Sequence, residues 1–155
     1  MLIEFPMMHV PFEAKKARNP KSKVWNLAVD FKSMENDNKV KEFLKFMEKI
    51  EKHLKSALNV EASHHDQKVE RVVPVLKQSN KRTRSKKKYP ALISLKYNPE
   101  YVTFENMEGQ ELHHETIDFK NNFVRPIVEL AYFWEFENKF YPMFYIVSCD
   151  VKLDQ

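Results

Sequence analysis

Two long runs of alternating residues in the C-terminal part of the chain constrain its fold more than any other feature. The first run extends from Phe123 to Phe136 and the second from Phe140 to Val151, with Glu137, Asn138 and Lys139 between them. Alternation of large apolar or aromatic residues with other residues is typical of β-strands, and the short separation predicts an antiparallel hairpin. Because both faces of this ribbon carry rings, it either lies between two hydrophobic layers or leaves rings exposed to a ligand.

Strict alternation divides each strand of the ribbon between two faces. On one face of the first strand it places Val124, Val128, Leu130, Tyr132, Trp134 and Phe136. On one face of the second strand it places Tyr141, Met143, Tyr145, Val147, Cys149 and Val151. The intervening residues are expected on the opposite faces.

The first half of the chain predicts one long helix and a short strand. Residues 1–22 contain three prolines, so we expect an extended or irregular N-terminal segment. Residues 24–31 alternate cleanly and predict a half-buried strand. From about Asn38 to Leu58 apolar residues recur every three or four positions, which predicts an amphipathic helix of about five turns, capped by Asn36 or Asp37. Its apolar stripe is expected to cover the sheet.

Strand signals continue on both sides of a basic stretch. Residues 69–76 form a β-prone run that a proline interrupts, and residues 89–97, 101–104 and 111–119 are extended, with turns between them. We therefore predict a single domain over residues 1–155, of α+β class and dominated by β-structure. Its architecture is expected to be a curled sheet or barrel of about five to seven strands, most of them in a meander, with one long amphipathic helix.

Composition excludes several classes of protein. With 43% hydrophobic and 31% charged residues, and no long apolar run, the chain is expected to fold without entering a membrane. The first residues lack the pattern of a signal peptide, and a lone cysteine, Cys149, excludes an internal disulfide, so we expect an intracellular, reducing compartment. Gly109 is the only glycine, which excludes glycine-rich phosphate loops and dinucleotide-binding motifs.

Positive charge gathers in one stretch. The net charge is only +4, but residues 77–88 contain seven cations and no acid. These cations are Lys77, Lys81, Arg82, Arg84, Lys86, Lys87 and Lys88. A basic loop of this kind contacts phosphate groups, serves as a nuclear import signal or is simply solvated, and the sequence leaves these three roles open.

The sequence offers no catalytic motif. No serine or cysteine lies in a nucleophile elbow or a cysteine–histidine signature, and the pairs His64–His65 and His113–His114 lack the pattern of a metal site. We therefore expect no enzyme activity and no cofactor or metal. A metal-dependent nuclease is the weaker alternative, and its carboxylates would come from Asp30, Glu129 and Asp150 on strands.

Cations and rings are interleaved along the predicted strands. Lys96 is next to Tyr97, and Lys139 is next to Phe140. Single-stranded nucleic acids bind to grooves in which cations contact phosphates and bases stack on rings. We therefore predict that the chain binds a single strand of nucleic acid. The candidate contacts on the ribbon itself include Arg125, Lys139 and Tyr141.

Three stretches resemble the core of a known family. They are the run YPALISLK from Tyr89 to Lys96, the extended residues 102–104 with Gly109 soon after, and the stretch from Val124 to Leu153. Together they are similar to the OB-fold single-stranded-DNA-binding proteins of large nucleocytoplasmic DNA viruses, over most of residues 23–153.

The resemblance implies an OB-like fold and a sequence-tolerant protein that coats viral single-stranded DNA during replication, recombination or repair, in the host cytoplasm or nucleus. It assigns DNA contacts to Lys96, Tyr97, Tyr132, Trp134 and the segment Lys81 to Lys88. The alternative function is a protein-interaction subunit of a viral replication or transcription complex, in which the same rings form an interface core. Binding of RNA and self-association are left open by the sequence.

Overall fold

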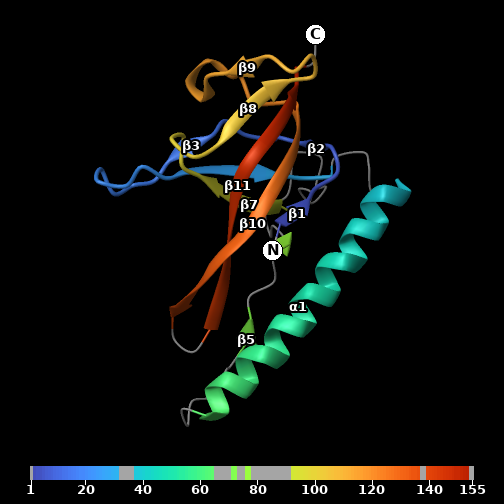
Figure 1. Cartoon of the computed structure of the whole chain (residues 1–155), viewed down its shortest axis with the longest axis vertical. Helices are drawn as coiled ribbons and strands as arrows, with labels where there is room; N and C mark the ends of the chain where they lie inside the picture. Colours follow the sequence, from blue (N-terminus) through green and yellow to red (C-terminus); the bar gives the residue numbers. More distant parts are fainter. Residues whose placement is uncertain are drawn as a thin grey trace, which may run out of the picture.

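The structure is a computed structural model that describes residues 2–31, 37–64, 71–72, 76–77, 92–136 and 139–153. Within these residues the chain forms one sheet of 11 strands, one long α-helix and one short 3-10 helix (Figure 1). The predicted α+β class, dominated by β-structure, is confirmed.

The strands differ greatly in length. They are β1 (Leu2–Glu4), β2 (Met8–His9), β3 (Lys15–Lys16), β4 (Trp25–Val29), β5 (Arg71–Val72), β6 (Leu76–Lys77), β7 (Leu92–Tyr97), β8 (Thr103–Asn106), β9 (Glu111–Leu112), β10 (Phe123–Phe136) and β11 (Lys139–Lys152). The helices are α1 (Asn38–His64) and η1 (His114–Thr116). Among the described residues, only β1, β4, β7, β8, β10 and β11 have three or more residues, in agreement with the expectation of about five to seven strands.

Strand β11 organises the sheet because its neighbours differ along its length. One edge of β11 pairs with β10 in antiparallel orientation over nearly the whole of both strands. The other edge pairs in parallel with β5, then with β7 where Tyr145 is opposite Lys96, and then with β8 from Ser148 to Val151. From β7 the sheet continues to β4 and β3, and β1 lies beyond β10 at the other edge.

The predicted meander is therefore wrong for β8. The chain turns after β7 as expected, with the Tyr101 N–H donating to the Asn98 carbonyl oxygen at 2.9 Å. However, β8 then pairs with β11 and β9 instead of returning along β7. Parallel pairing joins segments that are far apart in the sequence, and local alternation carries no information about such a partner.

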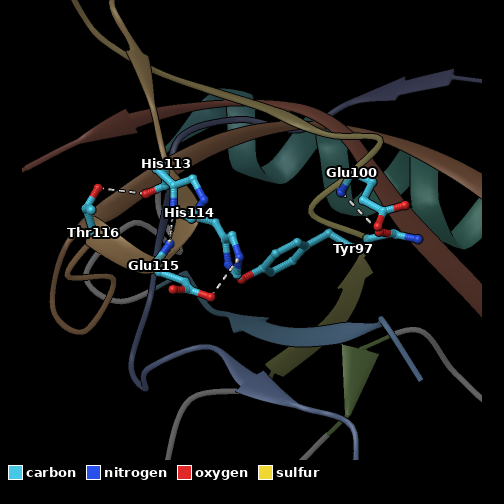
Figure 2. A network of polar contacts seen from close by, with 7 residues as sticks. Tyr97, Glu100, His113, His114, Glu115 and Thr116 are labelled. Atoms are coloured by element: carbon cyan, nitrogen blue, oxygen red, sulfur yellow. Dashed lines mark hydrogen bonds and ion pairs between the residues drawn. The ribbon is translucent and has the colours of Figure 1, made fainter. Parts of the chain in front are cut away.

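The extended run expected over residues 111–119 is also shorter in the structure, because β9 ends at Leu112 and η1 follows. The His113 ring accepts a hydrogen bond from the Glu115 N–H at 3.3 Å, and the Thr116 hydroxyl donates to the His113 carbonyl oxygen at 2.7 Å (Figure 2). Such local bonds give the backbone an alternative to a sheet ladder.

The predicted hairpin of β10 and β11 is confirmed, and its register contains two irregularities. Phe136 is opposite Lys139, so Lys139 belongs to β11 and not to the connection. Val147 of β11 and Ala131 of β10 are extra residues without a partner on the opposing strand. One extra residue in a strand is a β-bulge, and it moves the residues that follow to the other face.

These bulges correct the faces that strict alternation predicts. In β10, Val124 and Val128 are completely buried, whereas Tyr132 and Trp134, which follow the bulge, are 51% and 53% exposed. In β11 the buried side chains are at even-numbered positions before Val147 and at odd-numbered positions after it. They are Phe144, Ile146, Cys149 and Val151. The prediction that each strand keeps one set of residues on a single face along its whole length was wrong, because alternation cannot reveal an inserted residue.

The N-terminal segment completes the core. β1 and β2 both pair with β10, and the side chains of Ile3, Phe5, Met8 and Val10 are at most 2% exposed. Each buried side chain of this size stabilises the fold by about 1.5–3 kcal/mol. The segment is thus irregular, as expected, but it is fixed to the sheet.

Helix α1 begins at a clear cap and covers the core side of the sheet. The Asp37 carboxylate accepts a hydrogen bond from the Lys39 N–H at 2.8 Å, as expected of a capping residue. The ring centroid of Phe43 lies 4.6 Å from that of Phe5 and 6.0 Å from that of Phe31. The buried residues of the helix recur at helical spacing and are Val40, Phe43, Met47 and Ile50.

The far end of α1 extends to His64, beyond the predicted end near Leu58. No glycine or proline occurs between Asn59 and His64, so no residue there breaks the helix. This end contacts β5, and β5 pairs with the first residues of β11, Lys139 and Phe140 (Figure 1). Among the described residues, no helix combines the length and the apolar character that crossing a membrane requires.

Candidate nucleic-acid interface

One side of the sheet is the core, and the other, here called the outer face, is turned away from it. At the paired positions of β4 and β7, Leu27 and Leu95 are completely buried, whereas the adjacent residues Asn26 and Lys96 are directed to the opposite side and are half-buried. Paired residues on neighbouring strands share a face. The paired positions of β3, β4, β7, β11 and β10 therefore assign a set of residues to the outer face. They include Lys15, Asn26, Lys96, Glu129, Tyr132, Trp134, Tyr141, Met143 and Tyr145.

Two pairs of rings occupy the part of the outer face that the hairpin forms. Tyr132 and Tyr145 have centroids 6.0 Å apart and hydroxyl oxygens 3.4 Å apart. Trp134 and Tyr141 follow, with centroids 5.6 Å apart and ring planes at 44°. Burial and the hydrogen bond with Tyr132 raise the pKa of Tyr145 to about 12, so the Tyr145 hydroxyl stays protonated at neutral pH. The result is a neutral aromatic surface.

Two cations continue this surface across the sheet. Lys96 is the register partner of Tyr145 on one side and of Asn26 on the other, and its Nζ donates a hydrogen bond to the Asn26 side-chain oxygen at 2.9 Å. Lys15, which is exposed, is in turn the partner of Asn26. The Asn26 contact restrains the Lys96 side chain on the outer face, where an ammonium group is able to contact a phosphate.

Tyr97, which the resemblance assigned to the DNA contacts, does not belong to this surface. Its side chain is completely buried, its ring stacks near Trp25 with centroids 6.4 Å apart, and its hydroxyl lies 3.3 Å from Nδ1 of His114 (Figure 2). Since adjacent residues of a strand face opposite sides, the outward orientation of Lys96 requires an inward Tyr97. Trp25 is packed against the core, as the sequence indicated.

The Tyr97–His114 contact is electrically neutral. Burial raises the pKa of the Tyr97 phenol far above its ordinary value and lowers the pKa of the His114 imidazole. The hydrogen bond between the Tyr97 hydroxyl and Nδ1 of His114 therefore joins two neutral groups, and the His114 tautomer decides which of them donates. Among the described residues, no three histidine, cysteine or carboxylate side chains are grouped to hold a metal ion.

Arg125 lies on the same hairpin but away from the rings. Its guanidinium donates to the Asp150 carboxylate, with Nη2 at 2.8 Å and Nε at 3.3 Å, so its charge is locally balanced. Seven strand positions separate Arg125 from Tyr132, roughly 23 Å at the rise of an extended strand. The structure does not bring this predicted contact together with the aromatic surface.

The carboxylates of the nuclease alternative do not converge. Asp30 is 2% exposed and lies 2.9 Å from His9 in the core. Asp150 is paired with Arg125, whereas Glu129 is exposed opposite Tyr145. The geometry therefore offers no site at which these three groups would bind one metal ion.

Several predicted cations lie outside the residues whose side chains the structure describes. The backbones of Lys77 and Lys139 are described, in β6 and β11, but their side chains are not. The other residues of the basic segment lie outside the described residues, and they are Lys81, Arg82, Arg84, Lys86, Lys87 and Lys88. Their role in binding stays a prediction.

Sequence reasoning did not select the outer-face residues Lys15, Asn26 and Tyr145 as contacts. Tyr145 was visible in the alternation of β11, on the same side as Tyr141, but was not selected. Lys15 and Asn26 carried no local signal, because they join the surface only through the pairing of β3 with β4 and of β4 with β7.

Known structures with a similar fold were found by comparison. A single-stranded DNA-binding protein of bacteriophage T7, gp2.5, superimposes with a TM-score of 0.64 at 10% identity, covering 100% of this chain and 88% of its own. The single-stranded DNA-binding protein of bacteriophage Enc34, as a C-terminal truncation, superimposes with a TM-score of 0.62 at 15% identity, covering 99% of this chain and 87% of its own. The Enc34 protein in complex with single-stranded DNA superimposes with a TM-score of 0.58 at 13% identity, covering 99% of this chain and 87% of its own.

The chain has the fold of phage single-stranded-DNA-binding proteins. The OB-like architecture that the resemblance implied is thus confirmed, although these neighbours come from bacteriophages and not from large nucleocytoplasmic DNA viruses. No family model matches the sequence, and no curated protein sequence matches it significantly.

Proposed function

We propose that this protein binds single-stranded DNA without sequence preference. Bases would stack on Tyr132, Trp134 and the rings paired with them, and phosphates would contact Lys15, Lys96 and the basic segment over residues 77–88. The observation that carries the proposal is the half exposure of Tyr132 and Trp134 on the face that also holds the two lysines. The fold shared with proteins that bind single-stranded DNA supports it.

Exposed rings of this kind contribute little to the stability of the fold. A large ring left half in water forgoes much of the stabilisation that burial gives, whereas each base stacked on a ring contributes roughly 1–3 kcal/mol to binding. Because every base has an aromatic face, stacking on Trp134 and Tyr132 would be tolerant of sequence. We assign no catalytic step, cofactor or metal to this function.

The cellular role in this proposal is the coating of viral DNA during replication, recombination or repair, of the kind carried out in large nucleocytoplasmic DNA viruses. We place this role in an intracellular, reducing compartment, where a single cysteine needs no disulfide partner. Cys149 is buried, and burial raises its pKa well above the ordinary value. The thiol therefore stays protonated and unreactive.

Titration with oligothymidine at two salt concentrations tests the proposal. Trp25 packs on the core side of the sheet, so a change in tryptophan emission on binding reports mainly on Trp134. We expect quenching together with an affinity that falls steeply as salt increases. Absence of binding, or binding that is independent of salt, would contradict the proposal. A protein-interaction subunit would instead show no quenching and a mass that rises with protein concentration.

A further inference from the structure

One row of paired residues crosses the whole sheet on the outer face. From the β3 edge to the β1 edge it consists of Lys15, Asn26, Lys96, Tyr145, Glu129 and Leu2. The character of the row changes along its length. It begins with two cations and the amide between them, reaches a ring at Tyr145, and then meets a carboxylate and an apolar side chain that is 64% exposed.

Glu129 is the member of this row that a phosphate would avoid. Its side chain is exposed, and no described residue forms an ion pair with it. A single strand that ran straight from Lys96 past Tyr145 would bring a phosphate next to this carboxylate. Repulsion between two like charges at a protein surface lowers affinity by about three- to tenfold. Leu2, the next residue of the row, offers no charged partner.

The hairpin offers the strand another direction. Tyr145 contacts Tyr132, and the Trp134–Tyr141 pair continues along β10 and β11 instead of across the sheet. Figure 1 shows this part of the hairpin extending away from β3, β4 and β8. The bulge at Ala131 is what brings Tyr132 and Trp134 onto the face that Tyr145 occupies.

We propose that Glu129 ends the phosphate track that begins at Lys15 and Lys96, so that a bound strand turns at Tyr145 and follows the hairpin over Tyr132 and Trp134. This inference rests on the proposed function. In this proposal Glu129 forms no favourable contact with the ligand and sets its path by repelling the phosphates.

The substitution Glu129→Gln tests the path, with Glu108→Gln as its matched control. Both residues are exposed, and both substitutions remove one negative charge, but Glu108 lies in the turn between β8 and β9. Affinity for oligothymidines of increasing length is measured by anisotropy, and quenching of Trp134 is measured at saturation. We expect E129Q to bind about three- to tenfold more tightly than E108Q. We also expect less quenching in E129Q, because the straight path becomes available.

The outcomes separate the inference from the function on which it rests. Equal affinities of E129Q and E108Q would overturn the path while leaving single-strand binding intact. Higher affinity with unchanged quenching would also overturn it, because the strand would not have left the hairpin. Failure of the unsubstituted protein to bind any oligothymidine would overturn the proposed function itself. Thermal unfolding of both variants verifies that the exposed substitutions leave the fold unchanged.

Discussion

The imidazole Nδ1 of His9 lies 2.9 Å from Oδ1 of Asp30, and both side chains are almost completely buried. Their backbones also exchange hydrogen bonds, from the His9 N–H at 3.1 Å and from the Asp30 N–H at 2.8 Å. The two residues therefore tie the N-terminal segment to the end of β4. Asp30, a candidate carboxylate of the nuclease alternative, therefore stabilises the fold through its contacts with His9.

Replacement of Asp30 by alanine should lower the free energy of unfolding by about 2–4 kcal/mol, because the His9 imidazole would be left buried without its carboxylate. Chemical denaturation measures this loss. The double variant His9→Leu with Asp30→Leu is the control, since an apolar pair of similar size should recover much of the stability. Equal losses in the single and double variants would show that the two residues are not coupled.

Trp134→Ala should weaken oligothymidine binding by about 5- to 150-fold, the equivalent of one lost stacking contact. Its effect on the free energy of unfolding should be small, because the side chain is 53% exposed. Phe46→Ala is the matched control, since Phe46 is 45% exposed on α1, at the core side of the sheet. A similar loss of affinity in both variants would point to a general effect on the fold.

Lys96→Ala should weaken binding equally for all base sequences and reduce the slope of log affinity against log salt by about 0.7, because one phosphate contact would be lost. Titrations at four salt concentrations give this slope. Lys45→Ala removes an exposed charge from α1 and serves as the control. An unchanged slope in K96A would remove Lys96 from the interface.

Tyr97→Phe should leave oligothymidine affinity unchanged, because the ring is completely buried. The variant removes the hydroxyl that forms a hydrogen bond with His114, and it should lower the free energy of unfolding by about 1 kcal/mol. A large loss of affinity without a loss of stability would restore Tyr97 as a DNA contact.

Stability should fall as the pH decreases below about 6.5, the ordinary pKa of histidine. Burial lowers the pKa of His114 in the folded protein, so the unfolded chain binds a proton at a higher pH than the folded one. The contribution of His114 is thus complete above the unfolded pKa and is lost as the pH falls toward the folded pKa. Melting temperatures between pH 8 and pH 5 measure it, and the component should be absent in His114→Phe.

Periodicity in the sequence predicted the elements that local patterns determine. The hairpin follows from alternation on both sides of a short connection, and α1 follows from apolar residues at helical spacing after Asp37. The turn at Gly109 is also local, because φ of +83° at this position favours glycine. In these cases the residues that determine the structure are neighbours in the chain.

The outer face could not be predicted in the same way. Lys15, Lys96 and Tyr145 become neighbours only through strand pairing between segments that are far apart in the sequence. The bulge at Ala131 has no marker in its residue type, yet it decides that Tyr132 and Trp134 leave the core side. One available signal was overlooked, since Lys96 and Tyr97 are adjacent in a strand and cannot share a face.

The pairing of β11 has a consequence for synthesis on the ribosome. A nascent chain that ends at Phe136 already contains β5, β7, β8 and β10, but the strand with which all four pair has not yet been made. Its long unpaired edges would expose apolar surface until β11 emerges. Completion of the sheet therefore waits for the synthesis of β11, and protection of these edges until then would matter more than the speed of any local folding step.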